Sequence, residues 1–428
     1  MFQQNGLSLD QAPPISVVFR LFFSASLFGV LSGVLILFYG ITIFDPSSLG
    51  AVTLTHTLTL GVMASFMLGA LFQMLPVIAG VVLTSPIKRS LLVQIPFVLG
   101  TLSLLLAFNL SYPLLYSLAT LLLSFSLFGA IGMMVIRLLK VSNHSASSKG
   151  MVVALLSFGI TIALAIYLTS TLSDFASGEY YMEIKSLHYH FGLLGWITIL
   201  IFSISFQVIE MFYVTPPYPT VVSSYLVPSM FGLLIIGMPL ELIYPQISTY
   251  ITILFSIFMI SFALLTLYRL SQRKRPLADA TMWFWRLGLG SLVASMSFVA
   301  LHLLYPSSSY ISTLSIVSFV SFALSVVFAM FYKIVPFLTW FHLNAQGYYK
   351  APMMHEVIHP KTAKIHFWIH LSMLISLLLS LVDANFIYLA GIATMISFGW
   401  VAYQIAHAHL LYKKIEESGE KFDMGNYS

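Results

Sequence analysis

Apolar segments long enough to cross a lipid bilayer recur along this sequence, and they constrain its fold more than any other feature. Of its 428 residues, 59% are hydrophobic and only 8% are charged, whereas soluble domains have about 25% charged residues. A helix needs roughly 20 apolar residues to cross the bilayer core of about 30 Å. Backbone polar groups must be satisfied internally in lipid, so such segments fold as helices. The sequence therefore predicts an all-α polytopic membrane protein.

Twelve transmembrane helices are expected, separated by connections rich in proline, serine and charged residues. They fall near 16–44, 50–82, 90–109, 112–138, 151–172, 187–213, 220–243, 249–270, 280–304, 310–337, 366–383 and 386–411. The polar stretch Met1 to Pro14 leads straight into the first span, so no cleaved signal peptide is expected.

Lysine and arginine alternate between the two sides of this predicted topology. One set of connections, with the C-terminal tail, holds Lys88, Arg89, Lys140, Lys149, Arg273, Lys274, Arg275, Lys350, Lys361, Lys364, Lys413, Lys414 and Lys421, whereas the opposite set holds Lys185 alone. By the positive-inside rule, both termini are expected in the cytoplasm of a cell whose inner membrane the chain spans. This placement accounts for the net charge of +5, and no nucleic-acid partner is expected.

The chain contains an internal repeat. The segments HTLTLGVMASFMLGALFQMLP (56–76) and HFGLLGWITILIFSISFQVIE (190–210) align without a gap. They share an initial histidine, a glycine five residues later and Phe-Gln near the end. A third copy, 316–336, keeps the closing proline, lacks the histidine and has Lys333 in place of glutamine. The copies fall on spans two, six and ten, which predicts three four-helix units, about 16–138, 151–270 and 280–411.

His56 and His190 open two of these copies and are the strongest candidates for a cofactor site. Ionisable side chains within a span are costly and usually functional. Two imidazoles from equivalent positions can face each other and act as axial ligands of a b-type haem, with Gly61 and Gly195 leaving room for its flat face. The alternative is a pair of interfacial histidines bonded to nearby backbone. The absence of cysteine excludes thiolate ligands and covalent c-type haem.

His188 lies two residues before His190, so on a regular helix the two rings point to opposite faces. His188 can therefore ligate a second centre, either another haem or a copper ion, together with His302 from span nine. A solvated histidine at the membrane surface is the alternative.

These residues resemble the catalytic subunits of haem–copper oxidases and nitric oxide reductases. The resemblance rests on the His-x-His sequence before a glycine-rich aromatic helix and on the HTLTLG opening of span two. His56, Gly61, Gly69 and Pro76 are also spaced as in NnrS-type membrane haem proteins. The resemblance implies twelve spans in three arcs, cytoplasmic termini and haem ligation by His56.

The sequence also departs from the oxidase pattern. His-x-His lies on span six, not on span ten, and span seven (Thr220 to Ile243) has no histidine for the three-histidine copper site. The expectation is haem-based electron transfer or nitric oxide-related redox chemistry, with a redox partner protein at the outer face. A transporter with an intramembrane polar site is the alternative.

A third possibility rests on the segment His355-Glu356-Val357-Ile358-His359, which fits the H-E-x-x-H motif of zinc metalloproteases. The motif works only on a helix, where both histidines share a face. Pro360 follows directly and disfavours helix at His359, so a polar interfacial loop is the favoured interpretation.

Two further groups of polar residues lie toward the cytoplasmic side. His366 and His370, one helical turn apart, can bind a transition metal, or can act as anchors at the headgroup boundary, which we favour. Gln73, Gln207 and Lys333 occupy one position of the repeat, and we expect them to cap helices or meet headgroups.

Overall fold

The computed structural model describes residues 13–81, 83–274 and 279–421, and in this part of the chain twelve helices are long and apolar enough to cross a membrane. The predicted all-α polytopic class is confirmed. Arg275 lies outside the described residues.

The spans are α1 (Ile15–Tyr39) with η1 (Gly40–Phe44); α2 (Leu49–His56), η2 (Thr57–Ala64) and α3 (Ser65–Ala79); α4 (Pro86–Leu110); α5 (Pro113–Leu138); α6 (Ala146–Leu172); α7 (Tyr181–His190), η3 (Phe191–Thr198) and α8 (Ile199–Tyr213); α9 (Thr220–Gly232), η4 (Leu233–Gly237) and α10 (Met238–Ile243); η5 (Pro245–Ile247) and α11 (Ser248–Ser271); α12 (Ala280–Leu304); α13 (Ser309–Ala345); α15 (Pro360–Leu379); and α16 (Phe386–Ser418).

Local sequence signals fix where several of these helices begin. The side chains of Ser48, Ser145 and Asp279 accept hydrogen bonds from backbone N–H groups in the first turns of α2, α6 and α12. Helices α4 and α5 each have a proline at the first turn, where a missing N–H costs nothing.

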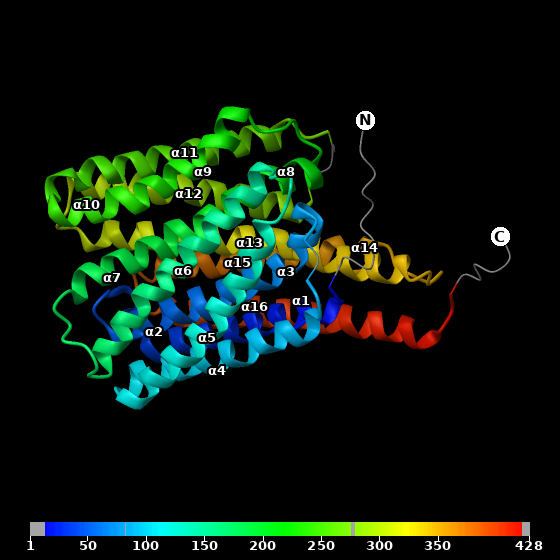
Figure 1. Ribbon diagram of the computed structural model, residues 1–428, viewed down its shortest axis with the longest axis horizontal. Helices are drawn as coiled ribbons and strands as arrows, with labels where there is room; N and C mark the ends of the chain where they lie inside the picture. The colour runs from blue at the N-terminus through cyan, green and yellow to red at the C-terminus, as the bar shows by residue number, and fades with distance from the viewer. Residues whose placement is uncertain (1–12, 82, 275–278, 422–428) are drawn as a thin grey trace.

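The helices run side by side in one bundle, with the start of α1 and the end of α16 toward the same end (Figure 1). The first and last spans, α1 and α16, pack along each other, as do the sequence neighbours α4 with α5 and α12 with α13. Large apolar side chains such as Phe38, Ile243 and Leu304 are exposed on the outside. An apolar exterior on a tightly packed bundle fits a lipid environment.

Two of the three repeat copies share an irregularity that ordinary helices lack. The π-helical segment η2 follows His56 directly, and η3 follows His190 directly, so the two segments occupy equivalent positions of the repeat. In the third copy, α13 continues as a regular α-helix. Wide turns of this kind are rare and occur frequently at functional sites. They distinguish the two copies that carry histidine.

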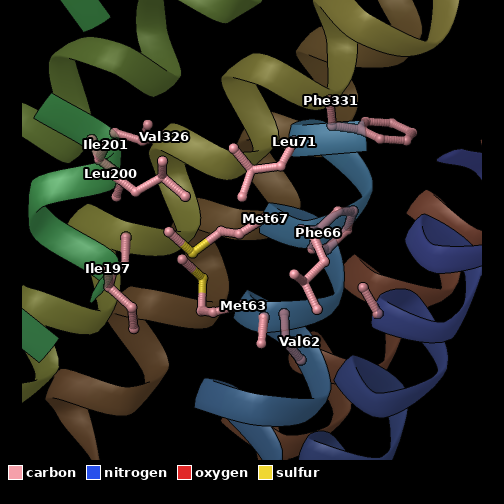
Figure 2. Close-up of a cluster of buried hydrophobic side chains, with 14 of the residues drawn as sticks. Val62, Met63, Phe66, Met67, Leu71, Ile197, Leu200, Ile201, Val326 and Phe331 are labelled. Atoms are coloured by element: carbon pink, nitrogen blue, oxygen red, sulfur yellow. The ribbon is translucent and has the colours of Figure 1, made fainter. Parts of the chain in front are cut away.

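The three repeat helices meet at the centre of the bundle, where their apolar side chains interlock (Figure 2). A cavity of about 70 Å³ lies there. Its lining includes three sets of residues at equivalent repeat positions: Phe66, Leu200 and Val326; Met67, Ile201 and Val327; and Ala70, Ile204 and Met330. Residues at equivalent positions of the three repeat copies therefore line one cavity.

Candidate functional site

His56 and His188 lie opposite each other between spans two and six. Their ring centroids are 6.3 Å apart, and the ring planes are inclined by only 15°. His56 is the last residue of α2, and His188 lies in the last turn of α7. Both side chains are half-buried. The structure thus brings together two imidazoles from helices more than a hundred residues apart in sequence.

Backbone hydrogen bonds fix the protonation pattern of these rings. The Nδ1 atom of His56 is 2.8 Å from the carbonyl oxygen of Val52, and Nδ1 of His188 is 3.0 Å from that of Thr161 on α6. A carbonyl oxygen only accepts, so each Nδ1 carries the proton and donates it. The lone pair of each neutral ring is then on Nε2. A histidine that binds a metal through one ring nitrogen usually donates the N–H of its other ring nitrogen to a carbonyl, carboxylate or water.

Aromatic side chains form the wall beside this pair. The Phe108 ring on α4 lies 4.9 Å from the His56 ring, centroid to centroid, and Phe108 also packs edge-on against Tyr116 at 5.9 Å. Phe108 is buried. Nothing in the sequence distinguishes Phe108 from the other 34 of the 35 phenylalanines in the chain.

His190 lies apart from this pair, contrary to the expected facing of His56 and His190. Its Nδ1 donates to the carbonyl of Ser186 at 2.9 Å, one turn back on the same helix, as His56 does to Val52. Its ring packs on Tyr189 at 4.2 Å, and the Glu241 carboxylate of α10 is its electrostatic neighbour. His190 therefore has the same local hydrogen-bond geometry as its repeat equivalent, His56. The rotation of α7 places His188, not His190, toward span two.

Gly61 and Gly195, the equivalent glycines of the repeat, have a different role from the expected one. A Cβ atom on Gly61 would lie 2.5 Å from the Phe28 ring of α1, and one on Gly195 would lie 2.7 Å from Ser157 of α6. Such distances are too short for any side chain. These glycines allow neighbouring helices to approach, and the space beside them is filled by protein rather than open for a porphyrin.

The centroid spacing of the His56 and His188 rings is similar to that of two imidazoles bound to one metal ion. Metal–imidazole bonds are about 2 Å long, and a ring centre lies roughly 1 Å behind its nitrogen, so two axial imidazoles have centroids about 6 Å apart. The observed 6.3 Å agrees with this spacing. The central cavity does not hold a macrocycle, because about 70 Å³ is only the size of a few water molecules.

The other histidines predicted as metal ligands lie elsewhere. His366 and His370 of α15 are fully buried, so the headgroup-anchor interpretation is wrong. Their Nε2 atoms are hydrogen-bonded to the hydroxyls of Ser397 and Ser325, each at 2.9 Å. His302 is in the last turn of α12. Within the described ranges, no group of three or more His, Cys, Asp or Glu side chains is arranged to hold a metal ion.

The H-E-x-x-H segment does not form the helix that a metalloprotease requires. Helix α14 (Met354–Val357) ends before the second histidine, and Ile358 has extended backbone angles. The Glu356 carboxylate accepts a hydrogen bond from the N–H of Met353, while His359 caps α15 through a bond from the N–H of Lys361. The two histidines are therefore not on one helical face, although His355 and Glu356 lie in the short helix α14 and not in a loop.

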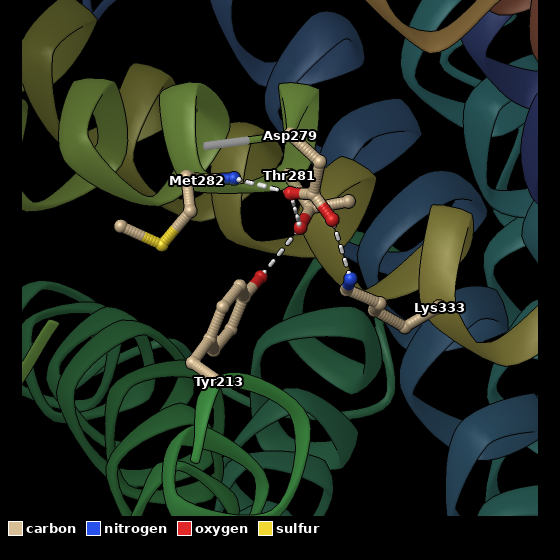
Figure 3. Close-up of polar contacts among 5 residues, drawn as sticks. All are labelled: Tyr213, Asp279, Thr281, Met282 and Lys333. Atoms are coloured by element: carbon tan, nitrogen blue, oxygen red, sulfur yellow. Dashed lines mark hydrogen bonds and ion pairs between the residues drawn. The ribbon is translucent and has the colours of Figure 1, made fainter. Parts of the chain in front are cut away.

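A polar network surrounds Lys333 (Figure 3). Its ammonium group donates to the Asp279 carboxylate at 2.7 Å, which also accepts from the Thr281 hydroxyl and the Met282 N–H. The Tyr213 hydroxyl donates in turn to Thr281 at 2.7 Å. Lys333 thus links α13 to α12 and α8.

The charge of Lys333 also affects Asp279, which lies just before the α12 span. Burial raises the pKa of the Asp279 carboxyl, but the attraction of Lys333 and the three donated hydrogen bonds outweigh it, so the pKa is lowered overall. Gln73, at the equivalent repeat position, is also buried, and both atoms of its amide lack a protein partner. The Gln73 side chain is therefore enclosed by protein and is not at a headgroup.

The fold defines this chain as an all-α integral membrane protein with twelve spans. A scan against protein-family models finds no family that matches it, and a search of curated proteins finds no similar sequence.

Proposed function

We propose that this chain is a membrane haem protein that uses His56 and His188 as the axial ligands of a b-type haem, for electron transfer or nitric oxide-related redox chemistry. The observation that carries this proposal is the facing pair of imidazoles, 6.3 Å apart, with both Nε2 lone pairs free. A second centre, haem or copper, remains part of the proposal through His190, whose Nε2 is also left free by its Nδ1 bond.

A haem bound in this way would carry one electron at a time. The residues of the chain would orient this haem and shield it from water. The carbonyls of Val52 and Thr161 hold the two rings in one tautomer and one orientation. The apolar wall at Phe108 keeps water from one side of the pair. A low dielectric and fixed ligand rings are the means by which a protein tunes the potential of such a centre.

The site lies at the membrane end that we assign to the outer face. This assignment follows from the positive-inside rule, which places both termini in the cytoplasm of a cell whose inner membrane holds the chain. An electron carrier near the outer surface would be within reach of a redox partner protein on that side. Lys185, which is exposed in the middle of α7, is a cation on that side for the propionates or for such a partner.

The test is the absorption spectrum of the purified protein and of four matched alanine variants, at His56, His188, His190 and His302. We expect a Soret band in the wild type that is lost in His56→Ala and His188→Ala and retained in His302→Ala. Retention in His190→Ala supports the pairing of His56 with His188. Loss in His190→Ala with retention in His188→Ala would instead support the repeat-equivalent pair.

Size-exclusion profiles distinguish a lost ligand from a misfolded variant. His188→Met serves as a second check, because methionine can also ligate haem iron. We expect this variant to keep a haem spectrum with a shifted reduction potential. A wild type that stays colourless after expression with ample haem, and after hemin titration, would refute the proposal. A transporter would then be the remaining alternative, although the apolar central cavity offers it no polar site.

A further inference from the structure

A groove between α4 and α5 combines apolar walls with two arginine side chains. Its volume is about 430 Å³, and Leu92, Val93, Phe125, Met133 and Ile136 form its apolar walls. Arg89 lies in the first turn of α4 and Arg137 at the end of α5, so both arginines are at the same end of the groove.

The two arginines are not neutralised by the protein. Both are half-buried, and neither forms an ion pair with a carboxylate of the described residues, whose ion pairs are Lys333–Asp279 and Lys350–Glu420. Two guanidinium groups that line one groove repel each other unless an anion lies between them. Guanidinium groups bind phosphate with paired, charge-assisted hydrogen bonds.

The floor of the groove has room for a chain. A Cβ atom on Gly129 would meet no atom within 4 Å, so the surface above it is open. The Ser126 hydroxyl, which also lines the groove, donates to the carbonyl of Val93 at 2.6 Å and thereby joins α5 to α4. The groove is thus apolar along its length and cationic at one end, and the Ser126–Val93 hydrogen bond joins its two helices.

We propose that this groove binds an anionic phospholipid, with its phosphate between Arg89 and Arg137 and one acyl chain over Gly129. Charge complementarity and the apolar walls select this occupant, because a free anion needs no apolar groove and a zwitterionic lipid gains less from two arginines. Basic pockets between transmembrane helices bind anionic headgroups in this manner. The site is independent of the histidine pair, so neither proposal depends on the other.

The experiment compares lipid retention by the purified full chain in detergent, measured by native mass spectrometry with added phosphatidylglycerol or phosphatidylcholine. We expect preferential retention of phosphatidylglycerol by the wild type. The double variant Arg89→Gln/Arg137→Gln should weaken the retention of phosphatidylglycerol about thirtyfold, because each cation near an anionic headgroup strengthens binding about fivefold. The matched control is Lys88→Gln/Lys140→Gln, which removes the same charge from exposed neighbours outside the groove, and it should keep the preference.

A second pair of variants tests the acyl chain without changing charge. Gly129→Leu fills the groove and should reduce retention, whereas Gly132→Leu, at a position that is equally open but does not line the groove, should not. Equal losses in the arginine and lysine variants would overturn the proposal in favour of diffuse surface charge. Competition by inorganic phosphate together with normal binding by Gly129→Leu would overturn it in favour of a simple anion site.

Discussion

Replacing Lys333 by glutamine should destabilise the protein, even though glutamine is the residue that the other two repeat copies carry at this position. The change removes the 2.7 Å ion pair with Asp279 and the ammonium group 5.2 Å from the Tyr213 ring centre. Breaking a fully buried pair costs about 3–5 kcal/mol, whereas exposed pairs contribute about 0–1 kcal/mol. The Lys333 side chain is 15% exposed and that of Asp279 is 44% exposed. This intermediate burial leads us to expect a loss of about 1–3 kcal/mol.

The assay is equilibrium unfolding in mixed micelles of the wild type, Lys333→Gln, Asp279→Asn and the double variant. We expect the double variant to lose less than the sum of the single losses, because each single change leaves one member of the pair unmatched. Lys350→Gln is the control: its partner Glu420 is also exposed, so we expect no measurable change in stability. Strict additivity of the single losses, or an equal effect of Lys350→Gln, would refute the reasoning.

Two more predictions concern pH and packing. Because the pKa of Asp279 is lowered in the folded protein from its ordinary value of 3.8, its ion pair stabilises the fold above that value, and the stabilisation is lost as the pH falls through the folded pKa. The stability difference between wild type and Asp279→Asn should therefore shrink below about pH 4 in unfolding experiments; a difference that is constant down to pH 2 would contradict this. Gly61→Ala should destabilise by about 1–3 kcal/mol through overpacking against Phe28. The control Gly290→Ala, which would meet no atom within 4 Å, should be neutral or stabilising by up to about 1 kcal/mol in the same assay.

The sequence determined the membrane class and the number of spans. Length and apolarity of a segment suffice for this, because a bilayer allows few alternatives to a hydrogen-bonded helix. The aligned segments 56–76 and 190–210 also share a local feature that the sequence did not predict, since the π-helical segments η2 and η3 occupy equivalent positions after His56 and His190. Pro360 predicted that the H-E-x-x-H segment would not be one helix, and the backbone at Ile358 agrees.

Tertiary structure decided which side chains meet. Spacing along a helix gives the angle between His188 and His190, but the rotation of that helix against its neighbours is set by packing, and it turns His188 toward His56. For the same reason sequence did not reveal that Lys333 pairs with Asp279, which lies 54 residues away, or that His370 is buried against Ser325. Hydropathy specifies that a residue lies in a span, whereas its partner depends on the positions of helices distant in sequence. The sequence therefore identifies the histidines at the ends of spans two and six as candidates. The packing of α7 on α6 determines that His188, and not His190, lies beside His56.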